Sequence, residues 1–328
     1  MLKMMKRLQL QSASTYSTLM TRSSPQIGLR LYKLMETDSV VSSSIDIQAI
    51  NILMNIYSKL DDEVSANSLL KKLELDPTIP PNIITYNTFI DACSRNGSLE
   101  LALSGLARLR KYSLEPDTTT YTSLISTVAR KGSNNSNRFG AMDPDMGFQL
   151  FNEMKSLNIL PNSITYCALI EVCNRCGRAD LALKVLRLML REEKNNAEGE
   201  MGDDFYDDKV GAFTATINAV AKEGNLKSAI KLFRSMEKYN SKPNEITCGC
   251  LIHHLLNKNL KDDGLDDAME ILGYMKENHL KPNEVIYASL ISANNQRQRV
   301  YTEREEGREP WQKILDVYFS IKVVENSE

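Results

Sequence analysis

The feature that most constrains the fold is internal repetition with a basic period of 35 residues. One aromatic-type position recurs at intervals of 35, 45, 47, 35 and 39 residues. Its occupants are Tyr86, Tyr121, Tyr166, Phe213, Cys248 and Tyr287. Turn glycines show the same intervals of 35, 45 and 47 residues, and they are Gly97, Gly132, Gly177 and Gly224. Because two independent markers share these irregular intervals, we infer a 35-residue unit with insertions of 10, 12 and 4 residues in some copies.

Each repeat carries the hydrophobic pattern of two short helices. Apolar residues recur at intervals of three and four residues between 83 and 96, as they do along one helical face, and again between 99 and 109. Gly97 separates the two runs, and glycine commonly ends a helix. No segment has the alternation of a strand. A helical hairpin of this size cannot bury its apolar face alone, so we predict an all-α solenoid in which stacked repeats share one core.

The repeat frame divides the chain into eight units. They are 13–46, 47–82, 83–117, 118–162, 163–209, 210–244, 245–283 and 284–328. In this frame residues 1–12 are an amino-terminal tail, and 13–328 form one solenoid instead of the two domains that the length suggests. We expect inserted loops near 133–145 and 192–208, and a second helix of the last unit over 310–324.

Composition restricts the classes of function. The chain has 40 Lys and Arg against 42 Asp and Glu, so its formal charge of -2 argues against a uniformly basic nucleic-acid binder. Six cysteines in 328 residues do not make a disulfide scaffold. No apolar run approaches the roughly 18 residues that a membrane span needs, so we expect no membrane partner.

Two clusters hold residues of the type that bind zinc. They are Cys173 with Cys176, and Cys248 with Cys250, His253 and His254. The frame places the clusters two repeats apart, on the order of 20 Å, whereas zinc ligands lie about 2.0–2.3 Å from the metal. The chain also lacks an HExxH motif, a phosphate loop and a GxSxG motif. We therefore expect no metal, no cofactor and no catalytic activity.

The segment "TYNTFIDACSRNG…EPD" and its copies resemble the pentatricopeptide repeat (PPR) family of organellar RNA-binding proteins, in its P-type form. The resemblance covers roughly residues 13–320 and is strongest over 83–290. It extends to the PPR region of protein-only RNase P. The 34-residue tetratricopeptide signature is absent. The resemblance implies a right-handed superhelix of about seven to eight two-helix repeats that binds single-stranded RNA, one base per repeat.

The resemblance also implies which residues contact the bases. The fifth and last residues of each repeat read the base, and the best pairs are Asn51 with Asn82, Asn87 with Asp117, Thr122 with Asn162, Thr214 with Asn244, and Gly249 with Asn283. The second residue sandwiches bases, and its aliphatic examples are Ile84, Ile164, Ile246 and Val285. The implied readout is U, A and A for the third, fourth and sixth repeats, with no assignment for the repeat 163–209. The alternative is that Asn and Asp before a helix are ordinary N-caps.

A basic residue recurs at position thirteen of five successive repeats. The set is Lys59, Arg95, Arg130, Arg175 and Lys222. These charges predict a stripe along which RNA phosphates lie, and binding that weakens as salt rises. The alternative is that Lys and Arg in the last turn of a helix simply favour the helix dipole.

The amino-terminal segment is basic and rich in Ser and Thr, with no acidic residue before Glu36, which resembles a mitochondrial or chloroplast transit peptide. The alternative is a degenerate first repeat over 13–46. The combined prediction is a monomeric, sequence-selective single-stranded RNA-binding protein of an organelle, acting in RNA processing, stability or translation. The rival interpretation is a protein–protein interaction scaffold, supported by the -2 charge and by the acidic 192–208 segment as a contact for a protein partner.

Overall fold

The computed structural model describes residues 12–38, 45–130, 144–197, 209–258, 263–284 and 286–290. Within these segments every regular element is a helix and no strand occurs, which confirms the all-α fold class. None of the described helices has the length and apolar character needed to cross a membrane. The chain divides into two compact units, residues 1–176 and 177–328. The boundary lies in the turn of the fifth repeat, and the single solenoid over 13–328 stays a prediction.

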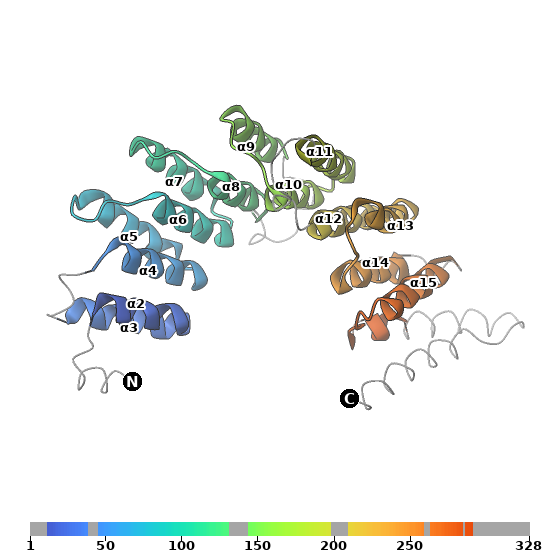
Figure 1. Cartoon of the computed structure of the whole chain (residues 1–328), viewed down its shortest axis with the longest axis horizontal. Coiled ribbons are helices and arrows are strands. Elements are labelled where there is room, and N and C mark those ends of the chain that lie inside the picture. The colour runs from blue at the N-terminus through green and yellow to red at the C-terminus, as the bar shows by residue number, and fades with distance from the viewer. Residues whose placement is uncertain are drawn as a thin grey trace, which may run out of the picture. The chain divides into compact units, whose positions relative to one another are not determined.

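The first unit is a row of helical hairpins. Its helices are α2 (Ala13–Arg22), α3 (Pro25–Thr37), α4 (Ile47–Lys59), α5 (Glu63–Leu75), α6 (Ile83–Asn96), α7 (Leu99–Lys111), α8 (Thr118–Arg130), α9 (Asp145–Ser156) and α10 (Ser163–Arg175). The first helices of successive repeats (α2, α4, α6, α8 and α10) pack on one another in one layer (Figure 1). Each second helix packs on its own first helix and on the first helix of the next repeat.

The second unit follows the same plan. Its helices are α11 (Ala179–Ala197), α12 (Lys209–Lys222), α13 (Leu226–Ser235) with the short 3-10 helix η3 (Met236–Tyr239), α14 (Glu245–Lys258) and α15 (Asp263–Glu277). First helices α12 and α14 pack together, and α13 packs on both of them. Helix α11 packs on α12, and α15 packs on α14.

The predicted frame agrees with the helix starts in all but one of the described repeats, and two details are wrong. Helix α11 continues to Ala197, so the first residues of the predicted 192–208 loop are helical; Glu and Lys favour helix, and Glu193 forms an ion pair with Lys209. Lys209 lies in the first turn of α12 instead of ending the preceding repeat. The remainder of the two predicted loops, the 310–324 helix and residues 1–11 lie outside the described residues.

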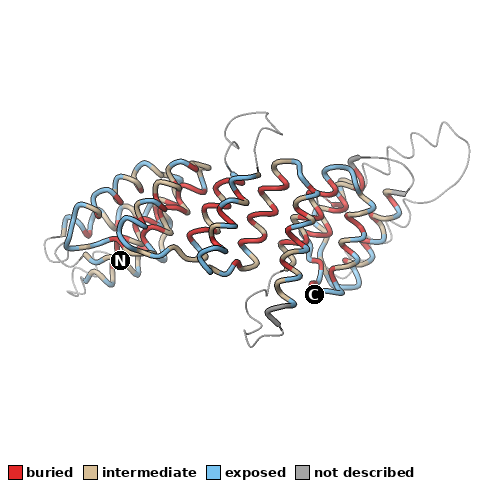
Figure 2. The backbone as a smooth tube through the Cα atoms, turned by 90° about the horizontal axis from the view of Figure 1, so that it is seen from above, coloured by how far each residue is buried: buried red, intermediate tan, exposed pale blue. Residues whose placement is uncertain are grey.

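The repeating aromatic position forms the centre of the core. Tyr86, Tyr121 and Tyr166 are fully buried in the first unit, and Phe213 and Cys248 are buried at the same position in the second. Figure 2 shows that buried positions recur along every described helix instead of gathering at one place. This distribution is the core expected of stacked hairpins, because each repeat buries its apolar face against its neighbours.

The turn between the two helices of a repeat needs a left-handed backbone. Three turn glycines have positive φ, namely Gly97, Gly177 and Gly224. In the second repeat Asp61 takes this position with φ of 54°. The amide of Asn96 in the next repeat donates a hydrogen bond to the Asp61 carbonyl at 3.0 Å, which helps to hold this less favourable conformation.

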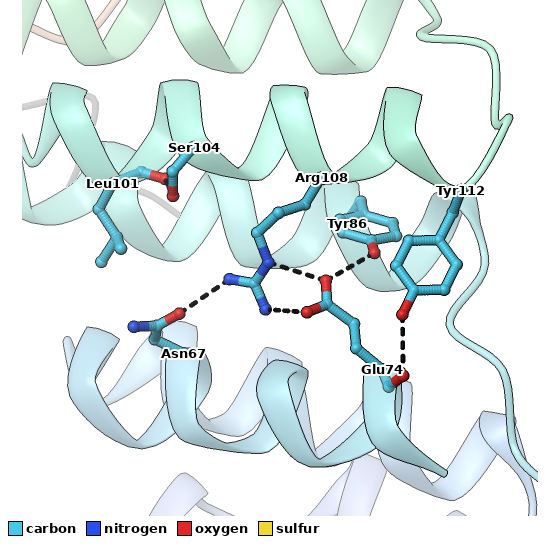
Figure 3. A network of polar contacts seen from close by, with 7 residues as sticks. All are labelled: Asn67, Glu74, Tyr86, Leu101, Ser104, Arg108 and Tyr112. Carbon is cyan, nitrogen blue, oxygen red and sulfur yellow. Dashed lines mark hydrogen bonds and ion pairs between the residues drawn. The ribbon is translucent and has the colours of Figure 1, made fainter. Parts of the chain in front are cut away.

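A polar network joins the second and third repeats (Figure 3). The Arg108 guanidinium of α7 donates two hydrogen bonds to the Glu74 carboxylate of α5, both at 2.8 Å, and a third to Asn67 at 2.9 Å. The Tyr86 hydroxyl donates to the same carboxylate at 2.8 Å, and Tyr112 donates to the Glu74 carbonyl at 2.8 Å. The network thereby links α5 and α7 to the first turn of α6.

Candidate nucleic-acid interface

The fifth and last residues of the third repeat lie in direct contact. The Asn87 amide of α6 donates to both carboxylate oxygens of Asp117, at 3.0 and 3.1 Å. Both side chains are partly exposed. The Asp117 oxygen Oδ1 also accepts from the backbone N–H of Thr120 at 2.8 Å, whereas Oδ2 accepts only from Asn87 among the described residues. The lone pairs of Oδ2 are therefore the ones that remain for a ligand donor.

The same juxtaposition recurs in the second repeat, where the Asn51 amide donates to Asn82 at a long 3.4 Å. In the fourth repeat, Thr122 and Asn162 are joined through a third residue. The Thr122 hydroxyl shares a hydrogen bond of 2.7 Å with Thr165, and Thr165 donates to Asn162 at 2.9 Å.

In the second unit the sixth repeat repeats this arrangement. Thr214 shares a hydrogen bond of 2.6 Å with Thr247, which donates to Asn244 at 2.9 Å. The seventh repeat differs because Gly249 has no side chain to meet Asn283. A Cβ built on Gly249 would lie 3.4 Å from the Ile286 side chain, so this position is lined by apolar atoms.

The last residues of the repeats are also N-caps of the helices that follow, as the alternative interpretation of these Asn side chains predicts. Asn82 and Asn162 each form a capping box with the threonine three residues later. Asn244 accepts from the backbone N–H of Thr247 at 2.9 Å, and Asn283 from that of Ile286 at 3.0 Å. The single side-chain oxygen of each asparagine accepts from the helix, and the NH₂ group takes no part in the cap. Capping and ligand contact are therefore compatible at these positions.

The second residue of three repeats exposes an aliphatic side chain to solvent. Ile84 is 57% exposed, Ile164 63% and Ile246 70%. Each lies at the start of a first helix, two positions after the last residue of the preceding repeat. Val285, the fourth predicted member, lies outside the described residues. The three exposed isoleucines therefore share one register of the repeat.

The predicted basic stripe is partly neutralised. Arg95 pairs with Asp91 at 3.1 Å and Arg175 with Glu171 at 2.9 Å, each one turn back on the same helix. These four side chains keep 39% to 46% exposure. Two members of the stripe are thus exposed cations that are each paired with a carboxylate. The other three members also lie in the last turns of first helices, and they are Lys59, Arg130 and Lys222. The Arg130 guanidinium donates a hydrogen bond to the Ser94 hydroxyl at 3.3 Å.

Of the zinc-type residues, the cysteines of α14 are held as thiols. Burial raises the pKa of Cys248 to about 12 and that of Cys250 to about 11. His254 contacts the Asn218 amide oxygen at 2.8 Å. Within the described part of the chain, no three His, Cys, Asp or Glu side chains are grouped as metal ligands would be.

Sequence reasoning missed one participant, the threonine at the third position of the following repeat. Thr85, Thr120, Thr165 and Thr247 are fully buried, and each contacts the fifth residue of the preceding repeat. In the sequence these residues stand out only as a Thr directly before the aromatic-type position in four copies. The pattern does not reveal their contacts, because each contact joins side chains of two different repeats.

The fold and these polar pairs define a helical-repeat protein in which repeats of each unit bring partly exposed hydrogen-bonding side chains together. Comparison with known families identifies the repeat. The PPR repeat family matches residues 81–130 and 208–257, and the pentatricopeptide repeat domain matches 149–194 and 242–297. Together these segments cover more than half of the chain. The chain therefore belongs to the pentatricopeptide repeat family.

Individual relatives are distant. The chloroplastic pentatricopeptide repeat-containing protein At3g49170 of Arabidopsis thaliana is 25% identical over 242 residues, covering 74% of this chain and 24% of the relative. The mitochondrial protein At1g53600 of the same plant is 26% identical over 163 residues, covering 49% of this chain and 20% of the relative. The chain thus spans about a quarter or less of these relatives.

Among solved structures, the chain is similar to maize PPR10, with a TM-score of 0.54 and 19% identity. The match covers 99% of this chain and 47% of PPR10. PPR10 in complex with an 18-nt psaJ RNA element gives a TM-score of 0.51 over 91% of this chain and 45% of PPR10. At this identity the likeness supports the fold alone.

Proposed function

We propose that this protein binds single-stranded RNA with base selectivity. The observation that carries the proposal is the repeated association of the fifth and last side chains, which is direct in two repeats and goes through a threonine in two others. Exposed isoleucines stand in the same register at the start of three first helices. Polar groups of this kind suit the Watson–Crick edge of an unpaired base, and the aliphatic side chains suit its face. Membership of the PPR family and the RNA complex of PPR10 support the same function.

The proposed readout combines hydrogen-bonding sense with the family resemblance. A carboxylate only accepts, so Asp117 suits the ring N–H of U or G, whereas Asn162 and Asn244 can donate to the ring nitrogen of A or C. The resemblance implies that Asn at the fifth position, here Asn87, favours pyrimidines and that Thr, here Thr122 and Thr214, favours purines. We expect the third to sixth repeats to select U-A-x-A, where x is the base of the repeat that has Cys167 at its fifth position.

We further propose an organellar site of action, because relatives from mitochondria and chloroplasts have matching sequences. The protein would act by occupancy and not by catalysis. A bound RNA segment is shielded from nucleases and from pairing with other segments, which supports RNA stability, processing or translation.

The test is to select, from a random single-stranded RNA pool, the RNAs that the purified chain retains at two salt concentrations. We expect enrichment of a short motif containing U-A-x-A, and weaker retention at the higher salt because phosphate contacts release counterions. If no RNA is retained even at low salt, the proposal fails and a protein ligand for the same surface becomes the better hypothesis.

A second expectation concerns Asp91, the carboxylate that pairs with Arg95 of the basic stripe. Replacing Asp91 by Asn should tighten RNA binding about two- to threefold at low salt and steepen the salt dependence by up to roughly 0.7 in log–log slope, because Arg95 is released to a phosphate. An amide oxygen still accepts the hydrogen bond that Ser58 gives to Asp91 at 2.9 Å. Filter binding across a salt series measures both effects.

The matched control for this variant is Glu100→Gln. Glu100 is an exposed acid in the first turn of α7, so its replacement changes the net charge equally but away from the stripe. Equal effects of the two variants would mean that net charge, and not Arg95, governs binding. An unchanged slope in Asp91→Asn would place the phosphates elsewhere.

A further inference from the structure

We propose that the third-position threonines Thr85, Thr120, Thr165 and Thr247 are positioning residues for base reading. Each belongs to the repeat that follows the pair it contacts. The inference rests on the proposed RNA-binding function and adds a third member to the pair that the family resemblance implies. It assigns to each threonine hydroxyl the task of fixing which polar atom its neighbour presents to the base.

The geometry at Thr120 defines the role. Its hydroxyl lies 2.6 Å from the Asn87 amide oxygen and 2.9 Å from Asp117 Oδ1. A hydroxyl has one proton, and the Asn87 oxygen is the closer acceptor. Asn87 is then held with its oxygen on Thr120 and its NH₂ group on Asp117. Neither end of the amide is left to rotate freely, so the pair presents one fixed pattern to a base.

The other three threonines occupy the same place. Thr85 donates to the Asn51 amide oxygen at 2.7 Å and lies 3.0 Å from Asn82. Thr165 and Thr247 share hydrogen bonds of 2.7 and 2.6 Å with the hydroxyl at the fifth position of the preceding repeat. All four threonines have 0% exposure, so water does not compete for these hydrogen bonds. Repetition in four places, across both units, argues against an accidental contact.

The chain also supplies the opposite case. Where the third position is Ile286, the fifth residue of the preceding repeat is Gly249, which has no polar atom to position. In the sequence, Ala212 likewise follows the repeat that has Cys167 at its fifth position. The hydroxyl is absent at these two poorer pairs, and it is also absent at Ala49, although the first repeat has the polar Ser17 at its fifth position.

Replacing the hydroxyl by a methyl group isolates this role. Valine has nearly the shape of threonine but cannot donate, so in Thr120→Val the Asn87 amide loses one of the two partners that hold it, and Asp117 alone remains on its NH₂ group. The backbone N–H of residue 120 still donates to Asp117, so this part of the α8 cap remains, while the Asp117 backbone N–H loses the Thr120 hydroxyl as a partner. With its oxygen unpaired the amide is held less firmly in one orientation, which weakens discrimination more than total affinity.

The experiment measures dissociation constants for four single-stranded RNAs that differ only at the base assigned to the third repeat. We expect the ratio between the preferred base and the next best base to fall about fivefold in Thr120→Val, the typical effect of one neutral hydrogen bond. Thr120→Ser keeps the hydroxyl and should retain the ratio. Thr127→Val is the matched control on the same helix, because the buried Thr127 hydroxyl donates to the Ser123 carbonyl of its own helix at 2.7 Å.

Thermal unfolding of each variant shows whether a change in RNA binding comes from a loss of stability. If Thr120→Val does not fold, Thr165→Val provides the same test at the base assigned to the fourth repeat. An equal loss of affinity for all four RNAs, with the ratio unchanged, would show a merely structural threonine and overturn the inference. A wild-type protein that binds none of the RNAs at low salt overturns the proposed function itself, and the inference falls with it. If the wild-type protein discriminates among the four RNAs and the valine variant discriminates equally well, the inference about the threonine is overturned but the proposed function stands.

Discussion

The double variant Asn87→Thr with Asp117→Asn is expected to change the base preferred at one position of a bound RNA from U toward A. The change replaces an acceptor-only carboxylate by an amide that donates. It also replaces the Asn that we propose to select a pyrimidine by the Thr found in the next repeat. We expect the U-to-A preference ratio to shift by about tenfold or more, equivalent to roughly 1.4 kcal/mol. Binding to an RNA panel that varies this base alone measures the shift.

The structure gives reasons to expect that this variant folds. Asn162 caps α10 as Asp117 caps α8, through an oxygen 2.8 to 2.9 Å from the backbone N–H three residues later. Thr122 is held by the threonine of the next repeat at 2.7 Å, so Thr120 can hold a threonine at position 87 in the same way. The reciprocal variant, Thr122→Asn with Asn162→Asp, should shift the next base from A toward U. Unchanged selectivity in both would disprove the base assignment.

The fold was predictable because its information is local and repeated. An apolar face repeated every 35 residues predicts the helices, and Gly97, Gly177 and Gly224 mark turns that do have the left-handed backbone. Where a repeat uses another residue, the signal disappears. Asp61 adopts the same turn without a glycine, and it is held in part by a hydrogen bond from Asn96, 35 residues later in the chain. A local pattern cannot contain such a contact.

The candidate site was predictable only in part, for the same reason. Repeat register locates fifth and last residues, but it does not show that a threonine of the next repeat joins them. Nor does it show that Asp91 forms an ion pair with Arg95. A carboxylate four residues before an arginine is common on exposed helices, so the spacing alone does not predict that the arginine is neutralised. The frame ends the fifth repeat at Lys209, whereas the structure places Lys209 in α12, where it pairs with Glu193 of the extended α11.

The largest effect on stability is expected from Arg108→Met. Arg108 and Glu74 keep only 19% and 17% side-chain exposure, and removal of the arginine leaves a carboxylate in a mostly buried place. We expect a loss of roughly 2 kcal/mol at neutral pH, below the ~3–5 kcal/mol typical of fully buried pairs because some solvent reaches this one. Methionine preserves the unbranched stem beside Phe89, whose ring centre lies 5.7 Å from the guanidinium carbon. Chemical denaturation measures the difference.

The loss should depend on pH in a definite direction. Burial alone would raise the pKa of Glu74, but hydrogen bonds from Arg108 and Tyr86 and the positive charges of Arg108 and Lys111 lower it below its ordinary value of 4.5. A carboxyl group with a lowered pKa in the folded state stabilises the protein above its unfolded pKa, and this stabilisation is lost as the pH falls through the folded value. The difference between wild type and variant should therefore narrow below about pH 4.5.

The exposed pair Arg234–Glu270 provides the matched control. It also joins second helices of successive repeats, α13 and α15, at 2.7 Å, but its side chains are 55% and 59% exposed. Arg234→Met should change stability little, because water replaces the partner. In the buried pair, Glu74→Gln combined with Arg108→Met should cost less than the two single variants added together, since the double variant leaves no unpaired charge. Additive losses would mean that Arg108 stabilises the second and third repeats by packing on Phe89 and not by its ion pair.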